Sequence, residues 1–341
     1  MPQQVLVGTR ASALALTQTG HVADALAAAG GLTVETVRVR TEGDRVRASL
    51  ATLGGTGVFV TALRDALLDG RCDVAVHSLK DLPTGPADGL VIAAVPPRAD
   101  PRDALCARDG LTLATLPAGA RVGTGSPRRA AQLRAARPDL DVVDIRGNVG
   151  TRLGRVRGLD GTTVAAGRHV GTQAPHPGVA TDAPQGDLDA VVLAAAGLAR
   201  LGRLDAVTEL FEADVLAPAP GQGALAVEVR AADAAADTPL AAALRALDHA
   251  PTRRAVVAER AVLARLEAGC AAPIGAWGRL DAAGALTLDA VVAAVDGSRV
   301  VRLRTHGPAP DDAAADALGR RLAEDLLAAG AADLAPLGTT R

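Results

Sequence analysis

The stretch Leu90-Val-Ile-Ala-Ala-Val-Pro-Pro-Arg-Ala-Asp-Pro101 divides the chain. Its first six residues are apolar and favour a strand, whereas the next six contain three prolines. Proline fixes φ and removes a backbone donor, so a helix does not continue through such a segment, and a stiff crossing between two domains does. We therefore predict a first domain boundary near residue 100.

Short β-branched runs alternate with longer helical periods before this crossing. We expect strands at about 5–7, 34–40, 73–79 and 90–95, and helices at about 13–29 and 58–68. Ser12 is suited to cap the first helix, and Gly30 with Gly31 to end it. The alternation predicts an α/β domain with a mostly parallel sheet.

Two further regions follow the crossing. The next has strands expected near 104–107, 121–123, 142–145 and 190–193, with helices after the turns at Arg128 and Gly147. The stretch from about 158 to 186 loses periodicity in a Gly/Thr/Ala/Pro-rich sequence, which predicts a surface loop or a disordered insertion. After residue 246, a helix near 252–266, strands near 274–280, 286–295 and 298–305, and a helix near 311–329 predict a separate α+β domain. Asp296-Gly297 supplies its hairpin signal.

Composition excludes several classes of protein. The 341 residues include 36 Lys+Arg and 38 Asp+Glu, so the formal charge of -2 lacks the excess of a non-specific nucleic-acid binder. Aromatic residues make up only 1% of the chain. Proteins that bind single-stranded nucleic acid stack its bases on aromatic side chains, so this function is not expected. Apolar runs are too short for a membrane span, and the first residues lack a positive secretion segment. We expect a cytoplasmic protein with no nucleic-acid or membrane partner.

The basic residues are almost all of one type, and several of them are grouped in expected turns. All of them are arginine except Lys80. Arginines with Ser or Thr occupy three expected strand-to-helix turns, Thr9-Arg-Ala-Ser12, Gly123-Thr-Gly-Ser-Pro-Arg-Arg129 and Asp144-Ile-Arg-Gly-Asn-Val-Gly-Thr-Arg152. Backbone N–H groups at helix starts and guanidinium groups bind anions, and strand ends in open α/β sheets form the ligand crevice. The pattern predicts one cleft for an anion with several carboxylates or phosphates.

Two other places carry reactive side chains. The expected strand from Asp73 ends in His77-Ser-Leu-Lys-Asp81, which is equally consistent with a catalytic cluster and with a polar cap on the strand. Cys270 lies in an expected helix-to-strand loop and is a candidate nucleophile or attachment point. Cys72 and Cys106 fit buried small hydrophobes. The three cysteines suggest neither a disulfide framework nor a metal site, and His169 and His176 lack partner ligands.

Seven stretches in order resemble the porphobilinogen deaminase (hydroxymethylbilane synthase) family over nearly the whole chain. They are Gly8-Thr-Arg-Ala-Ser12, His77-Ser-Leu-Lys-Asp-Leu-Pro83, Gly123-Thr-Gly-Ser-Pro-Arg-Arg129, Ile145-Arg-Gly-Asn-Val-Gly-Thr-Arg152, Leu193-Ala-Ala-Ala-Gly-Leu-Ala-Arg200, Pro220-Gly-Gln-Gly-Ala224 and Leu266-Glu-Ala-Gly-Cys-Ala-Ala-Pro-Ile-Gly275. The resemblance implies an α/β protein of three domains. The first two resemble type II periplasmic binding proteins with a doubly crossed chain, at 1–100 with 219–245 and at 101–218. The third, at 246–341, is a small α+β domain with an antiparallel sheet.

The resemblance also implies a transferase that joins four porphobilinogen molecules head to tail, with release of ammonia, in tetrapyrrole and haem biosynthesis. Its cofactor is a covalent dipyrromethane, here a thioether on Cys270, and Asp81 is the catalytic acid. Cofactor contacts implied are Lys80, Ser12, Ser126, Arg128, Arg129, Arg146 and His77. Substrate contacts implied are Arg10, Arg152, Arg200 and Gln222. We expect a monomer without metal, whose small-molecule partner is porphobilinogen.

Two departures from the family pattern leave other interpretations open. Thr56 and Thr61 stand where the family usually has lysines, and the insertion at about 158–186 replaces a short connection. A catalytically inactive relative is therefore one alternative. A non-catalytic anion-binding module is another, and it explains the arginine turns but gives Asp81 and Cys270 no task.

Overall fold

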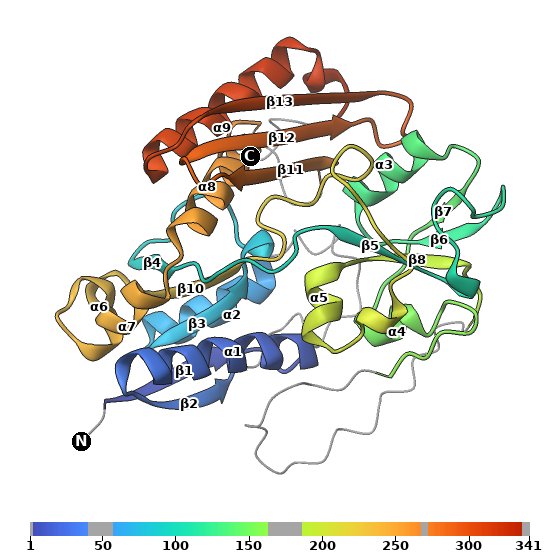
Figure 1. Ribbon diagram of the computed structural model, residues 1–341. Coiled ribbons are helices and arrows are strands. Elements are labelled where there is room, and N and C mark those ends of the chain that lie inside the picture. Colours follow the sequence, from blue (N-terminus) through green and yellow to red (C-terminus); the bar gives the residue numbers. More distant parts are fainter. Residues whose placement is uncertain (1–2, 40–56, 163–185, 267–271, 336–341) are drawn as a thin grey trace.

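The computed structural model describes residues 3–39, 57–162, 186–266 and 272–335. Three sheets of five, five and three strands organise this part of the chain (Figure 1). Ser12 caps the first helix through its side chain, which accepts from the backbone N–H of Ala15, and Gly31 ends that helix with φ of 59°. Both cap predictions are confirmed.

The first sheet has the order β2-β1-β3-β10-β4. Its strands are β1 (Gln4–Thr9), β2 (Thr33–Arg38), β3 (Val74–Ser78), β4 (Leu90–Ala94) and β10 (Leu225–Arg230). The helices of this region are α1 (Ala13–Gly30), α2 (Gly57–Leu68), α6 (Ala231–Ala235) and α7 (Pro239–Leu247), and the 3-10 turn η2 (Leu79–Asp81) follows β3 directly. Strand β10 comes from far along the sequence and lies between β3 and β4.

The second sheet has the order β7-β6-β8-β5-β9. Its strands are β5 (Asp103–Ala107), β6 (Arg121–Gly123), β7 (Asp141–Val143), β8 (Ala190–Ala194) and β9 (Glu209–Leu210). Helices α3 (Pro127–Ala136), α4 (Val149–Leu153) and α5 (Ala195–Arg200) and the turns η3 (Arg108–Gly110) and η4 (Leu204–Ala206) complete it. The expected insertion lies outside the described residues over 163–185.

The third region is α+β with an antiparallel sheet, as predicted. Helix α8 (Ala250–Arg265) precedes β11 (Ile274–Leu280), β12 (Ala285–Ala293) and β13 (Val300–Pro308), and α9 (Asp312–Ala328) and η5 (Ala331–Asp333) follow. The register pairs β11 with β12 and β12 with β13, all antiparallel. Helices α8 and α9 pack on this sheet above the two larger ones (Figure 1).

The chain crosses twice between the larger sheets, between β4 and β5 and again between β9 and β10. Gly221 and Gly223 in the second crossing have φ of 77° and 86°, which L residues with a Cβ rarely adopt. A Cβ at Gly223 would lie 2.6 Å from the carbonyl oxygen of Ala99 in the first crossing. The two crossings therefore lie against each other, and glycine permits their close approach.

The expectation of mostly parallel sheets is wrong. In the described part of the chain, each large sheet has two parallel and two antiparallel pairings. The antiparallel pairs arise where β5 begins the second sheet directly after the first crossing and where β10 returns to the first after the second crossing. The α/β class and the doubly crossed chain are confirmed.

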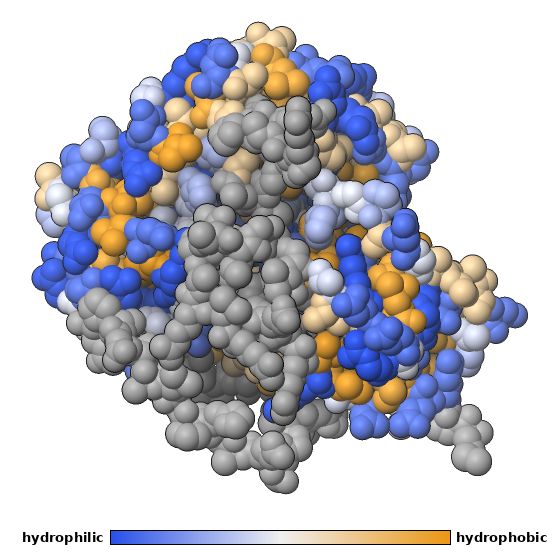
Figure 2. All heavy atoms as spheres, turned by 180° about the vertical axis from the view of Figure 1, so that it is seen from behind, coloured by the Kyte–Doolittle hydropathy of each residue, from blue (hydrophilic) through white to orange (hydrophobic). Residues whose placement is uncertain are grey.

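Small aliphatic residues fill the core. Val, Leu and Ala dominate its buried side chains, and Phe211 is the largest side chain among the fully buried ones described. Apolar residues appear as separate patches among hydrophilic ones on the face drawn in Figure 2. None of the helices in the described ranges is long and apolar enough to cross a membrane.

Candidate active site

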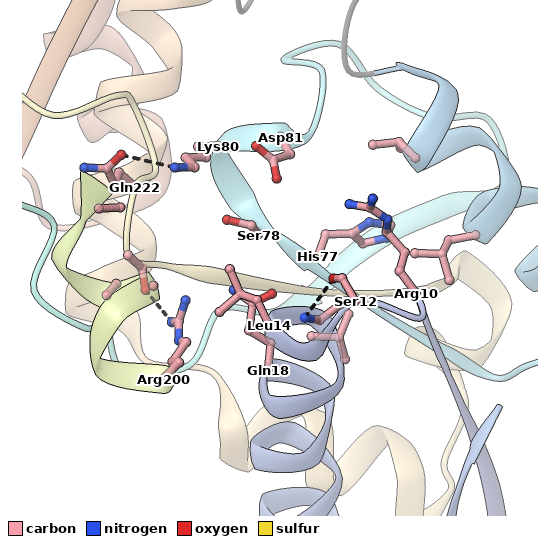
Figure 3. A pocket seen from close by; sticks show the side chains of 18 residues that line it. Arg10, Ser12, Leu14, Gln18, His77, Ser78, Lys80, Asp81, Arg200 and Gln222 are labelled. Carbon is pink, nitrogen blue, oxygen red and sulfur yellow. Dashed lines mark hydrogen bonds between the residues drawn. The ribbon is translucent and has the colours of Figure 1, made fainter. Parts of the chain in front are cut away.

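The turn η2 presents Lys80 and Asp81 at the end of β3. Leu79 and Leu82 are each 1% exposed, so the residues that flank the pair are fixed in the core. The backbone N–H of Leu79 donates to the carbonyl of Ala224, and that of Leu82 donates to the carbonyl of Leu79. The polar side chains between them are consequently directed toward a cavity (Figure 3).

This cavity, of about 240 Å³, lies where the two large sheets meet. Residues from the regions of both large sheets line this cavity. Its polar lining consists of Arg10, Ser12, Gln18, His77, Ser78, Lys80, Asp81, Arg200 and Gln222. Leu14, Val60, Leu63, Val76 and Ala196 are among its apolar walls. The structure thus brings together the first arginine turn, the strand-end cluster and the helix that follows β8.

Lys80 is half-buried within this charged cluster. Burial lowers the pKa of its ammonium to about 8, while Asp81 opposes the shift and Arg129 adds to it. Its Nζ donates a hydrogen bond of 3.2 Å to Oε1 of Gln222. An ammonium group whose pKa is close to neutral pH therefore lies beside the carboxylate of Asp81.

His77 belongs to a buried charged group below the cavity. Its Nε2 lies 3.2 Å from Oε2 of Glu228, and the guanidinium of Arg64 donates to the same carboxylate at 2.9 to 3.1 Å. Burial opposes ionisation of Glu228, but hydrogen bonds from His77 and Arg64 outweigh it and hold the pKa below its usual value. The carboxylate orients the imidazole that lines the cavity.

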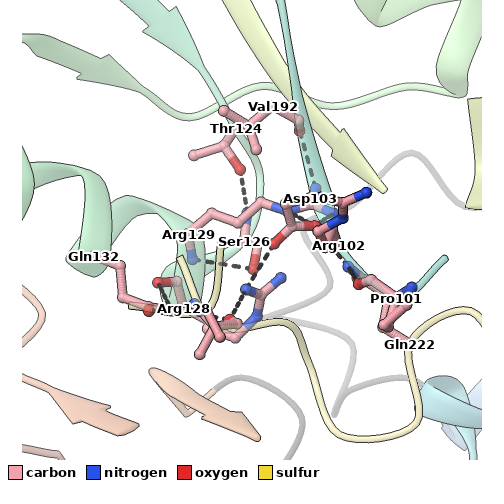
Figure 4. A network of polar contacts seen from close by, with 12 residues as sticks. Pro101, Arg102, Asp103, Thr124, Ser126, Arg128, Arg129, Gln132, Val192 and Gln222 are labelled. Carbon is pink, nitrogen blue, oxygen red and sulfur yellow. Dashed lines mark hydrogen bonds and ion pairs between the residues drawn. The ribbon is translucent and has the colours of Figure 1, made fainter. Parts of the chain in front are cut away.

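Arg128 and Arg129 begin helix α3 and converge on one carboxylate, that of Asp103 (Figure 4). Nη1 of Arg128 lies 2.8 Å from Oδ2, and Nη2 of Arg129 lies 2.7 Å from Oδ1. Asp103 is fully buried, yet the two arginines overcome the effect of burial and hold its pKa well below the usual range. One negative charge is set against two positive ones, so the group keeps a net positive charge.

Gln222 connects this group to the turn η2. Its Nε2 donates to Oδ1 of Asp103 at 2.7 Å and to the carbonyl of Pro101 at 2.8 Å, while its Oε1 accepts from Lys80. The side chain therefore has three partners within the protein. The amide of Gln222, in the second crossing, therefore contacts Pro101 in the first crossing, Asp103 on β5 and Lys80 in the turn after β3.

Three more arginines of the predicted set, Arg146, Arg152 and Arg200, lie outside the group of ion pairs around Asp103. Burial lowers the pKa of Arg200 to about 10, and its Nη2 donates to the carbonyl of Gly223. Burial, with Arg129 and Arg146 adding to it, lowers the pKa of Arg152 to about 10 as well. Arg146 is more exposed and lies 3.4 Å from Asp144. An incoming carboxylate would stabilise the charges of Arg152 and Arg200.

The two serines of the predicted set are helix caps. Oγ of Ser12 accepts from the N–H of Ala15 at 3.3 Å, and Oγ of Ser126 accepts from the N–H of Arg129 at 3.5 Å. A capping hydroxyl keeps its own O–H as a donor. Each serine thus stands at a helix N-terminus, where backbone dipoles favour an anion.

The predicted residues divide between the cavity and its surroundings. Arg10, Ser12, His77, Lys80, Asp81, Arg200 and Gln222 line the cavity, whereas Ser126, Arg128, Arg129, Arg146 and Arg152 do not. Cys270 and Thr56 lie outside the described residues. Thr61 lies on α2, away from the cavity lining. Across the described ranges, no group of three or more His, Cys, Asp or Glu is arranged to hold a metal.

The other two cysteines behave as predicted. Cys72 and Cys106 are both 0% exposed and free. Burial raises the pKa of Cys72 to about 11 and that of Cys106 to about 12, with smaller effects from neighbouring charges. A thiol with so high a pKa is a poor nucleophile at neutral pH.

Sequence reasoning missed Asp103, Glu228 and Glu259. Each is an acidic residue 0% or 1% exposed that accepts from an arginine distant in the sequence. Asp103 follows Arg102, and Glu259 precedes Arg260, so both looked like solvated charges. A useful signal was the position of Asp103 and Glu228 in apolar strands.

Comparisons with known proteins agree along the chain. The model described as "Porphobilinogen deaminase, dipyromethane cofactor binding domain" matches residues 5–169 and 180–238. The model described as "Porphobilinogen deaminase, C-terminal domain" matches residues 253–328. Together they span all three sheets.

Curated relatives with the name porphobilinogen deaminase are more than half identical. The one from Leifsonia xyli is 56% identical over 97% of this chain and 94% of the relative. Those from Micrococcus luteus and Cutibacterium acnes are 55% and 56% identical, over 98% and 99% of this chain and 95% and 99% of the relatives. Among solved structures, a periplasmic substrate-binding protein from Coxiella burnetii is 16% identical with a TM-score of 0.40, over 73% of this chain and 93% of that one. The family models and the curated relatives show that this chain belongs to the porphobilinogen deaminase family.

Proposed function

We propose that this chain catalyses the hydroxymethylbilane synthase reaction, in which four porphobilinogen molecules are joined head to tail into linear hydroxymethylbilane and ammonia is released at each addition. The observation that carries the proposal is the juxtaposition of Asp81 with Lys80, Arg10 and Arg200 around one cavity. Porphobilinogen carries an acetate and a propionate, so a growing chain accumulates carboxylates. Guanidinium groups bind these in a bidentate manner.

The donor set fits a dipyrromethane, whose two rings carry carboxylates. Arg152 and Arg200 are half-buried cations whose pKa values are lowered by partial burial, and the Asp103 group keeps a net positive charge. Residues proposed to hold the cofactor are Lys80, His77, Ser12, Ser126, Arg128, Arg129 and Arg146, with Cys270 as the point of attachment. When bound, the dipyrromethane supplies a free pyrrole α-carbon from which the product is extended.

Asp81 is the proposed catalytic residue. When the substrate's amine leaves as ammonia, its electron pair leaves with it, and positive charge spreads over the ring and its methylene carbon. A carboxylate near the pyrrole N–H stabilises that charge most where the cavity excludes water. Attack by the free α-carbon of the neighbouring pyrrole forms the carbon–carbon bond and moves the positive charge to that ring, where Asp81 stabilises it in the same way until the proton on the bonded carbon passes to water.

Arg10, Arg152, Arg200 and Gln222 are the proposed substrate contacts. Arg10 and Arg200 approach the cavity from opposite sheets, so a substrate held by both bridges the two α/β domains. The amide of Gln222 already has three protein partners. Gln222 therefore also holds Lys80 in place beside the substrate that it contacts.

The domain limits, cellular location and oligomeric state are also proposals. We propose domains at 1–100 with 219–245, at 101–218 and at 246–341, which agree with the three sheets. We propose a monomer in the cytoplasm, a reducing compartment in which thiols such as those of Cys72 and Cys106 stay free.

The activity is tested by incubating the purified protein with porphobilinogen. We expect release of ammonia and formation of hydroxymethylbilane, which cyclises and oxidises to a coloured porphyrin. A folded protein that binds porphobilinogen without releasing ammonia would instead indicate a binding module.

A further inference from the structure

One arginine from the third domain reaches the backbone of the turn that carries Lys80 and Asp81. Nη1 of Arg260, on helix α8, donates to the carbonyl of Leu82 at 3.0 Å and to that of Leu79 at 3.4 Å. Nη2 donates to the carbonyl of Pro83 at 2.6 Å. A single guanidinium thus holds carbonyls on both sides of Asp81.

The turn has little support of its own. Its ladder pairing ends at Ser78, which lies opposite Leu225. A 3-10 turn of three residues closes with one hydrogen bond, from the N–H of Leu82 to the carbonyl of Leu79. Pro83 cannot donate a backbone hydrogen bond. Contacts from outside the turn must therefore define where Asp81 lies.

Helix α8 supplies both apolar and polar contacts from one face. Val256 lies one helical turn before Arg260 and packs in the same cluster as Leu79 and Leu82. Residues four apart lie above one another on a helix, so the leucines and the carbonyls meet the same stripe of α8.

The helix itself is firmly fixed. Glu259, beside Arg260, is 0% exposed and accepts from the N–H groups of Gly221 and Gly278, each at 2.7 Å. The guanidinium of Arg98 donates to both of its oxygens. Arg260 therefore extends from a helix that is anchored to both crossings and to the third sheet.

We propose that Arg260 is a positioning residue for the reaction, which it serves by holding the turn that carries Asp81. The inference rests on the proposed function, because it assigns Arg260 a task through Asp81. Misplacing a catalytic group by about 1 Å costs on the order of 100-fold in rate, whereas carboxylate binding by the arginines is left unchanged. Loss of Arg260 then lowers kcat and spares KM.

The test compares Arg260→Met and Arg260→Lys with Arg254→Met. Arg254 lies on the same helix and donates to the carbonyl of Ala309, within the third domain, so it is a matched control. We expect kcat to fall roughly 10- to 100-fold in Arg260→Met with KM within about 2-fold, because positioning rather than binding is lost. Arg260→Lys should recover part of kcat, since an ammonium reaches fewer of the carbonyls. The control should retain wild-type kcat.

Hydrogen exchange measured by mass spectrometry reads the turn without reference to activity. Amides of residues 78–84 should exchange faster in Arg260→Met and unchanged in Arg254→Met. Wild-type kcat in Arg260→Met, equal losses in both Met variants, or unchanged exchange would overturn the proposal. If Arg260→Met does not fold, the same criteria apply to Arg260→Lys. An inactive wild type would count against the proposed function, while the exchange result would still decide whether Arg260 holds the turn.

Discussion

Lys80 donates from Nζ to Oε1 of Gln222, 3.2 Å away, and so joins the turn beside Asp81 to the second crossing of the chain. The same amide donates to Asp103, which pairs with Arg128 and Arg129. A continuous chain of polar contacts therefore runs from Lys80, the neighbour of the proposed catalytic Asp81, to the arginine pair in the first turn of α3. The single lysine of the sequence stands at its start.

Asp81→Asn should keep the fold and lose turnover, because it removes charge at nearly constant volume. We expect kcat to fall by about 100-fold or more, the loss typical when one preorganised electrostatic contact is removed. Steady-state kinetics measures this, with the thermal midpoint as the check on folding. Asp88→Asn, at an exposed position seven residues later, is the control. Near-wild-type turnover in Asp81→Asn would show that the acid is misassigned.

Lys80→Arg tests whether a compact ammonium is needed. Since burial lowers the pKa of Lys80 to about 8, the wild-type lysine loses its charge above that pH, and turnover should decline there. The arginine variant keeps its charge, so this alkaline decline should disappear. Its turnover at neutral pH should be lower, because a planar fork does not match the contact with Gln222. The pH profile of kcat/KM measures both, and full activity with an unchanged profile contradicts the assignment.

Arg200→Gln should weaken substrate binding. Removing a charge-assisted hydrogen bond to a carboxylate costs about 1.5 to 3 kcal/mol, which corresponds to a rise of roughly 10-fold or more in KM. Arg245→Gln, on the exposed side of α7, serves as the control for loss of one positive charge. An equal rise in both variants would indicate a general electrostatic effect rather than a contact.

Asp103→Asn should destabilise the protein by leaving two arginines buried without their carboxylate. Breaking a buried ion pair from one side costs about 3 to 5 kcal/mol. Asp139→Asn, which breaks the solvent-exposed pair with Arg137, should cost far less, because water screens that pair. Urea unfolding measures the free energies of both variants.

The pH dependence of this loss has a defined sign. The pKa of Asp103 is lower in the folded than in the unfolded chain, so its stabilisation is present above about pH 4 and is lost as the pH falls through the folded value. The difference between wild type and Asp103→Asn should therefore shrink below about pH 4. A difference that is constant with pH would mean that the carboxylate charge is not the source of the stability.

Local signals predicted most elements of the fold. The caps at Ser12 and Gly31 and the helix that begins at Pro127 could be predicted because each depends on neighbouring residues. Strand β10 could not, since its place between β3 and β4 depends on pairing with strands more than 130 residues earlier. The mixed sheets follow from the same long-range return.

Sequence motifs predicted some residues of the site, but contacts that depend on burial in the folded chain could not be predicted. Lys80, Asp81 and Arg10 lie together because strand ends meet at one edge of a sheet. The tie between Asp103 and two neighbouring arginines was not predictable, because only the folded crossings bury that carboxylate. Arg260 was missed for a similar reason, since its acceptors are backbone carbonyls.

The central claim is that this chain builds its product on a dipyrromethane held by Cys270. The most direct test is the intact mass of the protein after incubation with porphobilinogen, compared with that of Cys270→Ser. We predict a wild-type mass above that of the bare chain by two linked porphobilinogen units, and no such increase in the variant. A wild-type protein that keeps the bare mass, or a Cys270→Ser protein that carries the same adduct, would contradict it.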